Sequence, residues 1–226
     1  MLRSIRFGEA DRILHLYTPG KGRIGAIAKG ARKPKSRFGG RLEPFFRLDL
    51  VLYEGRGELL TVTSASTVDG HAALRRHGAS LTAAARGCEA VLRLFDSTEP
   101  SPAAYNLLCR YLTMLDAGRH ELSDALAFRL KLALVAGFAP ELAACALCGE
   151  RDELSGFSGA AGGVVCGACE GSAFGLSAAA HAFMVDSISR PLSEAPDADP
   201  RALRQAERAI SDTLEHHAHV RLGAAA

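Results

Sequence analysis

Residues 12–31 of the chain read RILHLYTPGKGRIGAIAKGA, with two apolar-rich runs on either side of a short turn segment. The apolar side chains Ile13, Leu14 and Leu16 of the first run are interleaved with polar ones, as in a strand with one buried face. Residues 18–22, TPGKG, supply proline and glycine for a turn, and the second run resumes the strand pattern. The stretch therefore predicts a β-hairpin near the start of the chain.

Two further runs extend this strand pattern. FRLDLVLY at 46–53 and ELLTVTSAS at 58–66 are separated by EGRG, which predicts a second hairpin. Across residues 5–67 we expect about five short strands in an antiparallel meander. Five short strands with many basic side chains are typical of a small closed barrel of the oligonucleotide-binding (OB) type.

Beyond about residue 70 the spacing of Ala and Leu becomes helical. It predicts three packed helices, at 80–95, 101–116 and 122–138, and two more, around Ala178–Arg190 and after Asp199. Ser101-Pro102 is typical of a helix start, and Gly118 and Gly137 fall where helices should stop. The final GAAA, residues 223–226, is expected to fray.

Four of the six cysteines form two Cys-x-x-Cys pairs, Cys145/Cys148 and Cys166/Cys169, with seventeen residues between the pairs. This spacing is typical of a zinc site with four cysteine ligands, and four thiolates leave no open position for a substrate. Glycines at 149 and 167 should let backbone N–H groups approach the sulfurs. An iron–sulfur cluster and a dithiol redox pair are the alternatives to structural zinc.

The predicted fold class is therefore α+β: an N-terminal OB-fold β-barrel followed by an α-helical domain with an inserted four-cysteine zinc module. The expected domains are 1–68 for nucleic-acid binding and 69–226 for the helices, with the zinc module at 143–172. The N-terminal sequence has charges where a signal peptide needs an apolar block, and no window resembles a membrane span. We expect a cytosolic protein.

Charge is unevenly divided along the chain. Residues 1–64 hold 13 Lys and Arg against 6 Asp and Glu, a local charge of +7, whereas the remainder holds 14 against 19, a charge of −5. A basic module joined to a mildly acidic one suggests that the first part meets a polyanion.

The basic connector, defined as residues 29–47, concentrates these cations. It reads KGARKPKSRFGGRLEPFFR and is opposed only by Glu43; its cations are Lys29, Arg32, Lys33, Lys35, Arg37, Arg41 and Arg47. Lys and Arg neutralise phosphates and release counterions, and the aromatic rings Phe38, Phe45 and Phe46 offer either stacking faces or, more often, core. The alternative is an ordinary solvated loop. We expect binding to the nucleic-acid backbone without sequence preference and with strong salt dependence.

Other candidates carry less weight. Glu9 and Asp11 are typical of a surface ion network, and the histidines at 216, 217 and 219 of a polar helix end. The sequence contains no Walker-type glycine loop and no Ser or Cys nucleophile motif, which favours a protein that is not an enzyme. The rivals are an RNA-binding translation or ribosome-associated zinc protein and an enzyme that uses the cysteines in redox or metal catalysis.

Taken in order, GEADRILHLYTPGKG, AKGARK and the helix leading into CALCG closely resemble the bacterial recombination mediator family RecO, over nearly the whole chain. The resemblance implies the OB barrel and zinc-bearing helical domain, binding of single- and double-stranded DNA, and annealing of complementary strands. It implies partnership with RecR in helping RecA displace single-strand-binding protein, in the cytoplasm and on the nucleoid.

The resemblance also assigns residues. It places a phosphate-contacting surface at Arg12, Lys29, Arg32, Lys33, Lys35, Arg37 and Arg41, and zinc at Cys145, Cys148, Cys166 and Cys169. Relatives usually carry several more residues before the segment matching LRSIRFGEAD, so we expect the first barrel strand to begin late, with an exposed edge.

Overall fold

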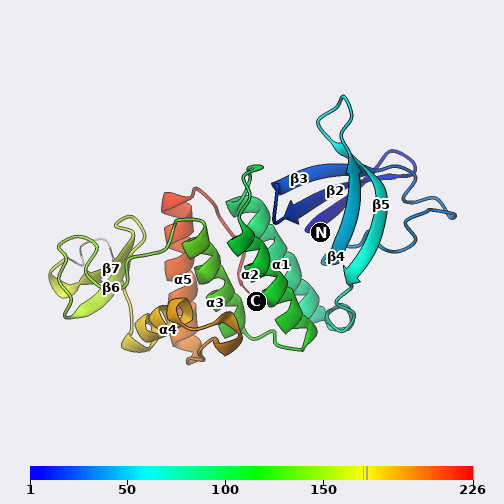
Figure 1. Cartoon of the computed structure of the whole chain (residues 1–226). Coiled ribbons are helices and arrows are strands. Elements are labelled where there is room, and N and C mark those ends of the chain that lie inside the picture. Colours follow the sequence, from blue (N-terminus) through cyan, green and yellow to red (C-terminus); the bar gives the residue numbers. More distant parts are fainter. Residues whose placement is uncertain (170, 172, 226) are drawn as a thin grey trace. The chain divides into compact units, whose positions relative to one another are not determined.

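The computed structural model describes residues 1–169, 171 and 173–225. Contacts divide the chain into two compact units, Met1–Gly118 and Arg119–Ala226 (Figure 1). The first unit holds a five-stranded sheet and two helices, and the second holds three helices and a small three-stranded sheet. None of the helices in the described residues has the length and hydropathy needed to cross a membrane.

The first sheet explains the strand pattern of the N-terminal sequence. Its strands are β1 (Arg3–Phe7), β2 (Asp11–Thr18), β3 (Gly22–Ala28), β4 (Arg47–Tyr53) and β5 (Leu60–Asp69). They lie in the order β1-β2-β3-β5-β4. Both predicted hairpins are confirmed as antiparallel pairs, β2 with β3 and β4 with β5.

The prediction of a purely antiparallel meander is wrong at one place, because β3 and β5 pair in parallel, Ala26 opposite Leu60. The long connector between β3 and β4 lets the chain leave the position next to β3 empty. Strand β5 then occupies this position, between β3 and β4.

The mixed α+β class is confirmed, but a closed barrel is not shown. Strands β1 and β4 stand at the two ends of the strand order. The two ends approach each other at Met1, whose ammonium group donates to the Phe46 carbonyl at 2.7 Å while its own carbonyl accepts the Phe45 N–H at 2.9 Å. Phe45 has φ 73°, a backbone conformation that non-glycine residues rarely adopt. Two hydrogen bonds at one residue thus connect the chain start to the segment before β4.

A hydrophobic core lies on one face of this sheet. Along β3, buried and half-buried side chains alternate, as the period of a strand requires. Two connector side chains, Phe38 and Leu42, complete the core at 3% exposure each. Its other fully buried members are Leu14, Leu16, Ile24, Ala26, Ala28 and Val62.

All five predicted helices are confirmed. They are α1 (Gly78–Leu94) and α2 (Pro102–Asp116) in the first unit, and α3 (Leu122–Val135), α4 (Ala178–Ser189) and α5 (Pro200–His217) in the second. Short 3-10 turns occupy Leu74–Arg76, Gly167–Cys169 and Leu192–Glu194. The Ser101 hydroxyl accepts the Ala104 N–H at 3.3 Å, which satisfies one of the unpaired donors at the start of α2. Gly118 and Gly137 follow α2 and α3 with φ values of 85° and 83°.

The expected fraying of the last residues is wrong for residues 223–225. The Arg129 guanidinium, itself 4% exposed, donates to the carbonyls of Gly223 at 2.7 Å and Ala224 at 3.0 Å. Ala225 is buried and its N–H bonds a carboxylate oxygen of Glu207. A buried cation that donates to backbone carbonyls outweighs the entropy of a short terminal segment. Ala226 lies outside the described residues.

The small sheet of the second unit holds the cysteine segment. Strands β6 (Leu154–Ser158), β7 (Gly163–Cys166) and β8 (Phe174–Gly175) lie in the order β7-β6-β8. The β6–β7 hairpin confirms the predicted return between the two cysteine pairs, and its register sets Leu154 opposite Cys166.

Candidate functional site

The basic connector folds as a series of tight turns between β3 and β4. The N–H of Lys33 bonds the Gly30 carbonyl at 3.1 Å, and the N–H of Ser36 bonds the Lys33 carbonyl at 2.9 Å. Gly39 and Arg41 continue the series with bonds to the carbonyls three residues before each. A segment whose own backbone groups are paired in this way has a defined path, so the positions from which its side chains project are defined as well.

Two apolar side chains hold the connector on the sheet. Phe38 and Leu42 insert into the core, and burial of each contributes about 1.5–3 kcal/mol. Phe38 is therefore a core residue. The guanidinium carbon of Arg37 lies over its ring, 4.9 Å from the ring centroid. The ring of the half-buried Phe46 is covered by Arg75, whose guanidinium carbon lies 4.8 Å from the ring centroid. Neither ring offers the free stacking face that the sequence allowed.

Polar side chains of β2 fix both ends of the connector. One Asp11 carboxylate oxygen accepts the N–H of Gly30 at 2.7 Å. The Arg12 guanidinium donates to the Leu42 carbonyl at 3.0 Å and forms an ion pair with Glu43 at 3.3 Å. Asp11 thus has a structural role, more specific than the surface ion network that we expected.

The predicted phosphate-contacting residues fall into three groups. Lys29, Lys33 and Lys35 are exposed, and no carboxylate of the described residues forms an ion pair with them. The guanidinium groups of Arg32, Arg37 and Arg41 are exposed but each donates to a backbone carbonyl. The half-buried Arg12 binds the Leu42 carbonyl and Glu43 within the first unit.

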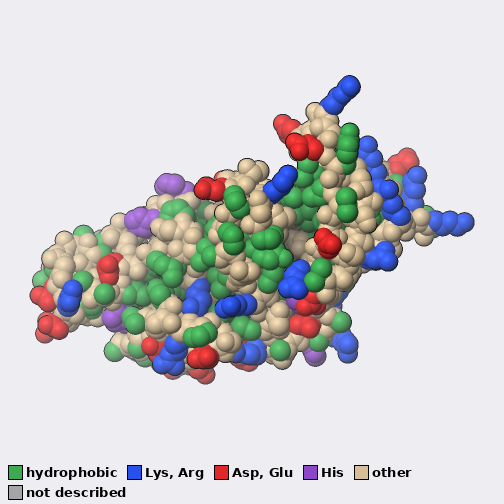
Figure 2. All heavy atoms as spheres, in the orientation of Figure 1, with side chains coloured by type: hydrophobic (Ala, Val, Ile, Leu, Met, Phe, Trp, Pro, Cys, Tyr) green, Lys and Arg blue, Asp and Glu red, His purple; other side chains and the backbone are tan. Residues whose placement is uncertain are grey.

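The anchored connector can therefore present an array of cations to a polyanion. Figure 2 shows Lys and Arg side chains gathered on this part of the first unit, where β1–β3 and the connector lie. Several unpaired ammonium groups on one anchored segment create a positive potential, which attracts phosphate and falls off over about 10 Å at 0.1 M salt.

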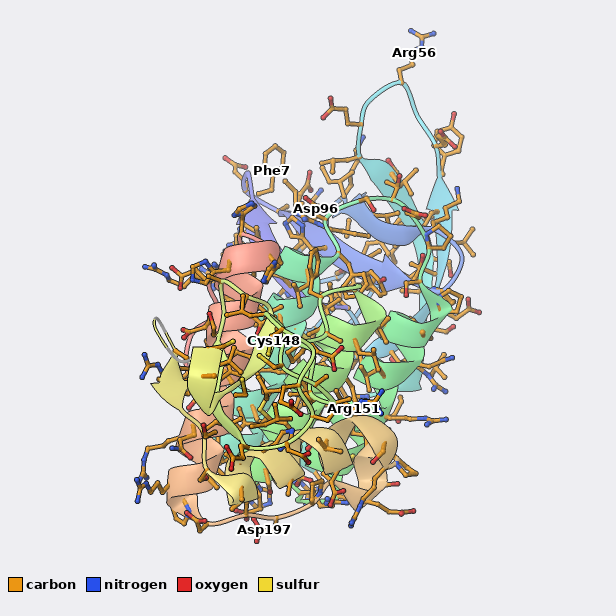
Figure 3. All side chains as sticks on the ribbon, turned by 90° about the vertical axis from the view of Figure 1, so that its left-hand side faces the viewer. Phe7, Arg56, Asp96, Cys148, Arg151 and Asp197 are labelled. Atoms are coloured by element: carbon orange, nitrogen blue, oxygen red, sulfur yellow. The ribbon has the colours of Figure 1, made fainter. Side chains whose placement is uncertain are left out.

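The four predicted cysteine ligands come together in the second unit. Their sulfur atoms all lie within 4.8 Å of one another, and those of Cys148 and Cys166 are 3.7 Å apart. Four sulfurs at about 2.3 Å from a tetrahedral zinc ion would be about 3.8 Å from each other. Cys145 and Cys166 are buried and Cys148 is exposed, at the position labelled in Figure 3. The cluster fits a metal ion in both donor type and spacing.

The first cysteine pair lies on a tight turn. The Cys145 N–H donates to the Glu150 carbonyl at 2.6 Å, and the Gly149 N–H returns to the Cys145 carbonyl at 2.8 Å. Gly149 has φ 81°, which only glycine adopts without strain. Gly149 therefore closes the turn, and the backbone donors to the Cys145 sulfur come from other residues: Cys166, Cys148 and Leu147.

Hydrogen bonds within the cluster shift the pKa values of three of its thiols in different directions. Backbone donors, first that of Cys166, lower the pKa of Cys145 to about 6. Hydrogen bonds from neighbouring thiols, first Cys148, raise the pKa of Cys169 to about 12. For Cys148 the backbone N–H of Glu150 lowers the pKa, but the thiols of Cys145 and Cys166 outweigh it and the net pKa is raised. Close sulfurs that share protons in this way release them to a divalent cation that takes their place.

Sequence reasoning missed Phe7. This side chain is 51% exposed at the end of β1, beside the connector. The only signal in the sequence is strand alternation, which places Phe7 on the opposite face of the sheet from Ser4 and Arg6. Of the histidines near the end of α5, His217 contacts the Gly159 carbonyl through Nε2 at 2.8 Å, which is a packing role.

Two models of known protein families match the chain, and together they cover nearly all of it. The family model described as Recombination protein O N terminal matches residues 1–71, and the model described as Recombination protein O C terminal matches residues 75–225. The two models together span both units.

Several curated proteins are similar to the chain over most of their length. The DNA repair protein RecO of Rubrobacter xylanophilus is 40% identical over 217 residues, which cover 93% of this chain and 86% of the relative. The DNA repair protein RecO of Anaeromyxobacter sp. strain K is 36% identical over 234 residues, 99% of this chain and 91% of the relative. That of Streptomyces avermitilis is 35% identical, with 96% and 91% covered.

Proposed function

Since the chain belongs to the RecO family of DNA repair proteins, we propose that it is a DNA-binding recombination mediator. In this proposal it binds single- and double-stranded DNA and anneals complementary strands. With RecR it assists the loading of RecA onto DNA covered by single-strand-binding protein. It acts in the cytoplasm on the nucleoid, and it makes or breaks no covalent bond.

The exposed lysines of the anchored connector carry this proposal. Lys29, Lys33 and Lys35 lack ion-pair partners among the described residues, so a phosphate meets their full charge. The arginines at 32, 37 and 41 keep further N–H donors beyond those used for carbonyls, because a guanidinium has five. Their roles, and that of Arg12 in holding the frame, belong to the proposal.

Annealing follows from charge neutralisation. Two complementary strands repel each other through their phosphates, and a cationic surface lowers that repulsion while it raises the local concentration of both strands. Contacts to the phosphates leave the base edges free to pair. A protein of this kind needs no catalytic residue, because pairing of the bases supplies the free energy.

We assign the second unit to protein partners and to a structural zinc ion. Cys145, Cys148, Cys166 and Cys169 would hold the ion, which would join the turn at 145–150 to the end of β7. Four thiolate ligands fill the coordination sphere of zinc, so its contribution is to stability. In the proposed division, residues 1–68 bind DNA. Residues 69–226, which comprise the second unit and helices α1 and α2 of the first, form the helical partner domain, and residues 143–172 form its metal module.

The RNA-binding alternative is not favoured, because every relative reported above is named as a DNA repair protein. Its parts are shared with RNA-binding proteins, however, so the test of the proposal includes an RNA competitor.

The test compares annealing of two complementary fluorescent DNA strands by the wild type and by a variant with Lys29→Ala, Lys33→Ala and Lys35→Ala. We expect the wild type to accelerate annealing at low salt and to lose the effect as salt rises. The variant should bind single strands more weakly, and its plot of log affinity against log salt should be less steep by about 2, because each lost phosphate contact on a single strand contributes about 0.7.

A matched control removes the same charge elsewhere. Arg151, Arg201 and Arg204 are exposed in the second unit, and their triple replacement by Ala should leave the slope unchanged. Equal losses in both variants would show that only net charge matters and would contradict the assignment to the connector. Preference for structured RNA over single-stranded DNA in competition would move the RNA alternative ahead.

A further inference from the structure

We propose that Phe7 is a stacking platform for a base of single-stranded DNA, and that the connector holds the phosphates beside it. The inference rests on the proposed DNA binding and adds to it a site that distinguishes single strands from duplex. Its basis is the position of Phe7 on the sheet, the surroundings of its ring and the cations next to it.

Phe7 lies on the outer face of the sheet. Strand alternation directs Leu2 and Ser4 toward the core side, where Leu2 is 4% exposed, and directs Ile5 and Phe7 to the opposite face. Phe7 is 51% exposed, and Figure 3 shows its ring standing clear at the end of β1. A ring with about half of its surface exposed can offer a face to a planar partner.

A row of isoleucines continues the apolar surface from Phe7. Ile5 lies opposite Ile13, and Ile13 opposite Ile27, so the three side chains cross β1, β2 and β3 on the outer face. The other end of this face is covered within the same unit, where Tyr17 packs edge-on against Phe95 at 5.8 Å. The uncovered end is the one that carries Phe7.

The connector lies directly beside Phe7. A guanidinium nitrogen of Arg32 donates to the carbonyl of Gly8 at 3.4 Å, and the Arg32 backbone N–H donates to the Ala10 carbonyl at 2.8 Å. Apart from the adjacent residues of the chain, no atom of the described residues lies within 4 Å of where a Cβ on Gly8 would be, so this side of Gly8 is open.

Two acids share this turn with the connector cations. Glu9 is exposed, whereas the carboxylate of Asp11 is occupied by the N–H of Gly30. The nearby cations Lys29, Arg32 and Lys33 outnumber these two acids.

This arrangement of ring and cations suits one class of ligand. Stacking on an aromatic side chain contributes about 1–3 kcal/mol per base and tolerates any sequence, since every base has a flat face. In a duplex the bases are stacked on each other, so the ring cannot reach a base face without unstacking the helix. The cations bind both forms, but Phe7 adds affinity for the single strand alone. The annealed product loses this contact and is released more readily.

The sequence contains no tryptophan, so Phe7→Trp introduces a single fluorescent reporter. The full-length variant would be titrated with an oligothymidylate of about 16 nucleotides and, separately, with the same strand in a duplex. Anisotropy of the labelled DNA would report binding in parallel. We expect the tryptophan emission to be quenched by the single strand and unchanged by the duplex. The matched reporter Tyr53→Trp, at a 64% exposed site on the other edge strand, should stay constant with both.

Affinity measurements on Phe7→Ala and Phe7→Leu complete the test. Both should weaken binding of the single strand about five-fold or more, with an unchanged salt slope and unchanged duplex affinity, because no phosphate contact is lost. Silent tryptophan emission at saturating single strand overturns the stacking site alone, as does equal quenching by the duplex. Absence of DNA binding by the wild type at low salt overturns the proposed function, and the stacking site with it.

Discussion

Arg12 and Lys33 were predicted to share one role, and their surroundings separate them. The Arg12 guanidinium bonds the Leu42 carbonyl and pairs with Glu43, so it holds the end of the connector to β2. Lys33 is exposed, and its aliphatic chain from Cγ to Cε lies beside Gly30, within 4.0 Å of where a Cβ on that residue would be. A positive charge thus serves structure at Arg12, whereas at Lys33 it is available for the proposed contact with phosphate.

We expect Arg12→Ala to lower the free energy of unfolding by about 1–2 kcal/mol, because hydrogen bonds to a charged donor are lost and a half-buried carbonyl loses its partner. Lys33→Ala should change it by less than about 0.5 kcal/mol and should lower the salt slope of DNA binding by about 0.7. Urea unfolding and DNA anisotropy on the same two proteins measure both quantities. A stability loss in Lys33→Ala equal to that of Arg12→Ala would contradict the division.

Sequence patterning predicted which segments form strands, helices and turns, because each of these depends on neighbouring residues. The five helices and both hairpins follow from spacing and from capping residues such as Ser101. The parallel pairing of β3 with β5 depends on where the connector carries the chain, which local spacing does not encode. The exposure of Phe7 was missed for a related reason, since an aromatic residue in a short strand is expected in the core.

At the scale of elements, the turn at 145–150 and the β6–β7 hairpin are short and are joined through their cysteines. The small core here consists of Cys145, Val165 and Cys166 with a few half-buried neighbours. So few apolar side chains supply little free energy, and a metal held by the four cysteines would add to the stability of the module. Sequence spacing predicted that these four cysteines come together, because the two pairs are separated by a single hairpin.

We expect one divalent ion per chain in the purified protein, with no visible absorbance, and loss of the ion in Cys148→Ser and Cys166→Ala. Metal analysis measures the content, and limited proteolysis at 150–153 should speed up when the ion is lost. Cys109→Ala, outside the cluster, is the control and should retain the metal. Broad visible absorbance with iron and sulfide would instead identify an iron–sulfur cluster. Retention of a full equivalent of metal by Cys148→Ser would remove Cys148 from the ligand set.

For the whole molecule, charge and metal are divided between different parts of the chain. Residues 1–64 carry a net charge of +7 and the remainder −5, so the field that would attract DNA in the proposed function arises from the first part. A zinc ion with four thiolates has a net charge of about −2, so the metal centre adds no attraction for phosphate. DNA binding should therefore be independent of the metal, although both belong to one protein.

We expect removal of the metal by a chelator to leave the affinity for bare single-stranded DNA and its salt slope unchanged. Assistance in loading RecA onto DNA covered by single-strand-binding protein should fall, because that step is proposed to use the second unit. Anisotropy at several salt concentrations and a RecA loading assay on the same samples measure the two effects, and re-addition of zinc should restore the second. The triple variant Lys29→Ala, Lys33→Ala and Lys35→Ala should behave in the opposite way in DNA binding. It should retain the metal, and the salt slope of its affinity for single-stranded DNA should be lowered. A salt slope that falls on chelation would mean that the metal module itself contacts DNA, and the connector would then be one part of a larger DNA-binding surface.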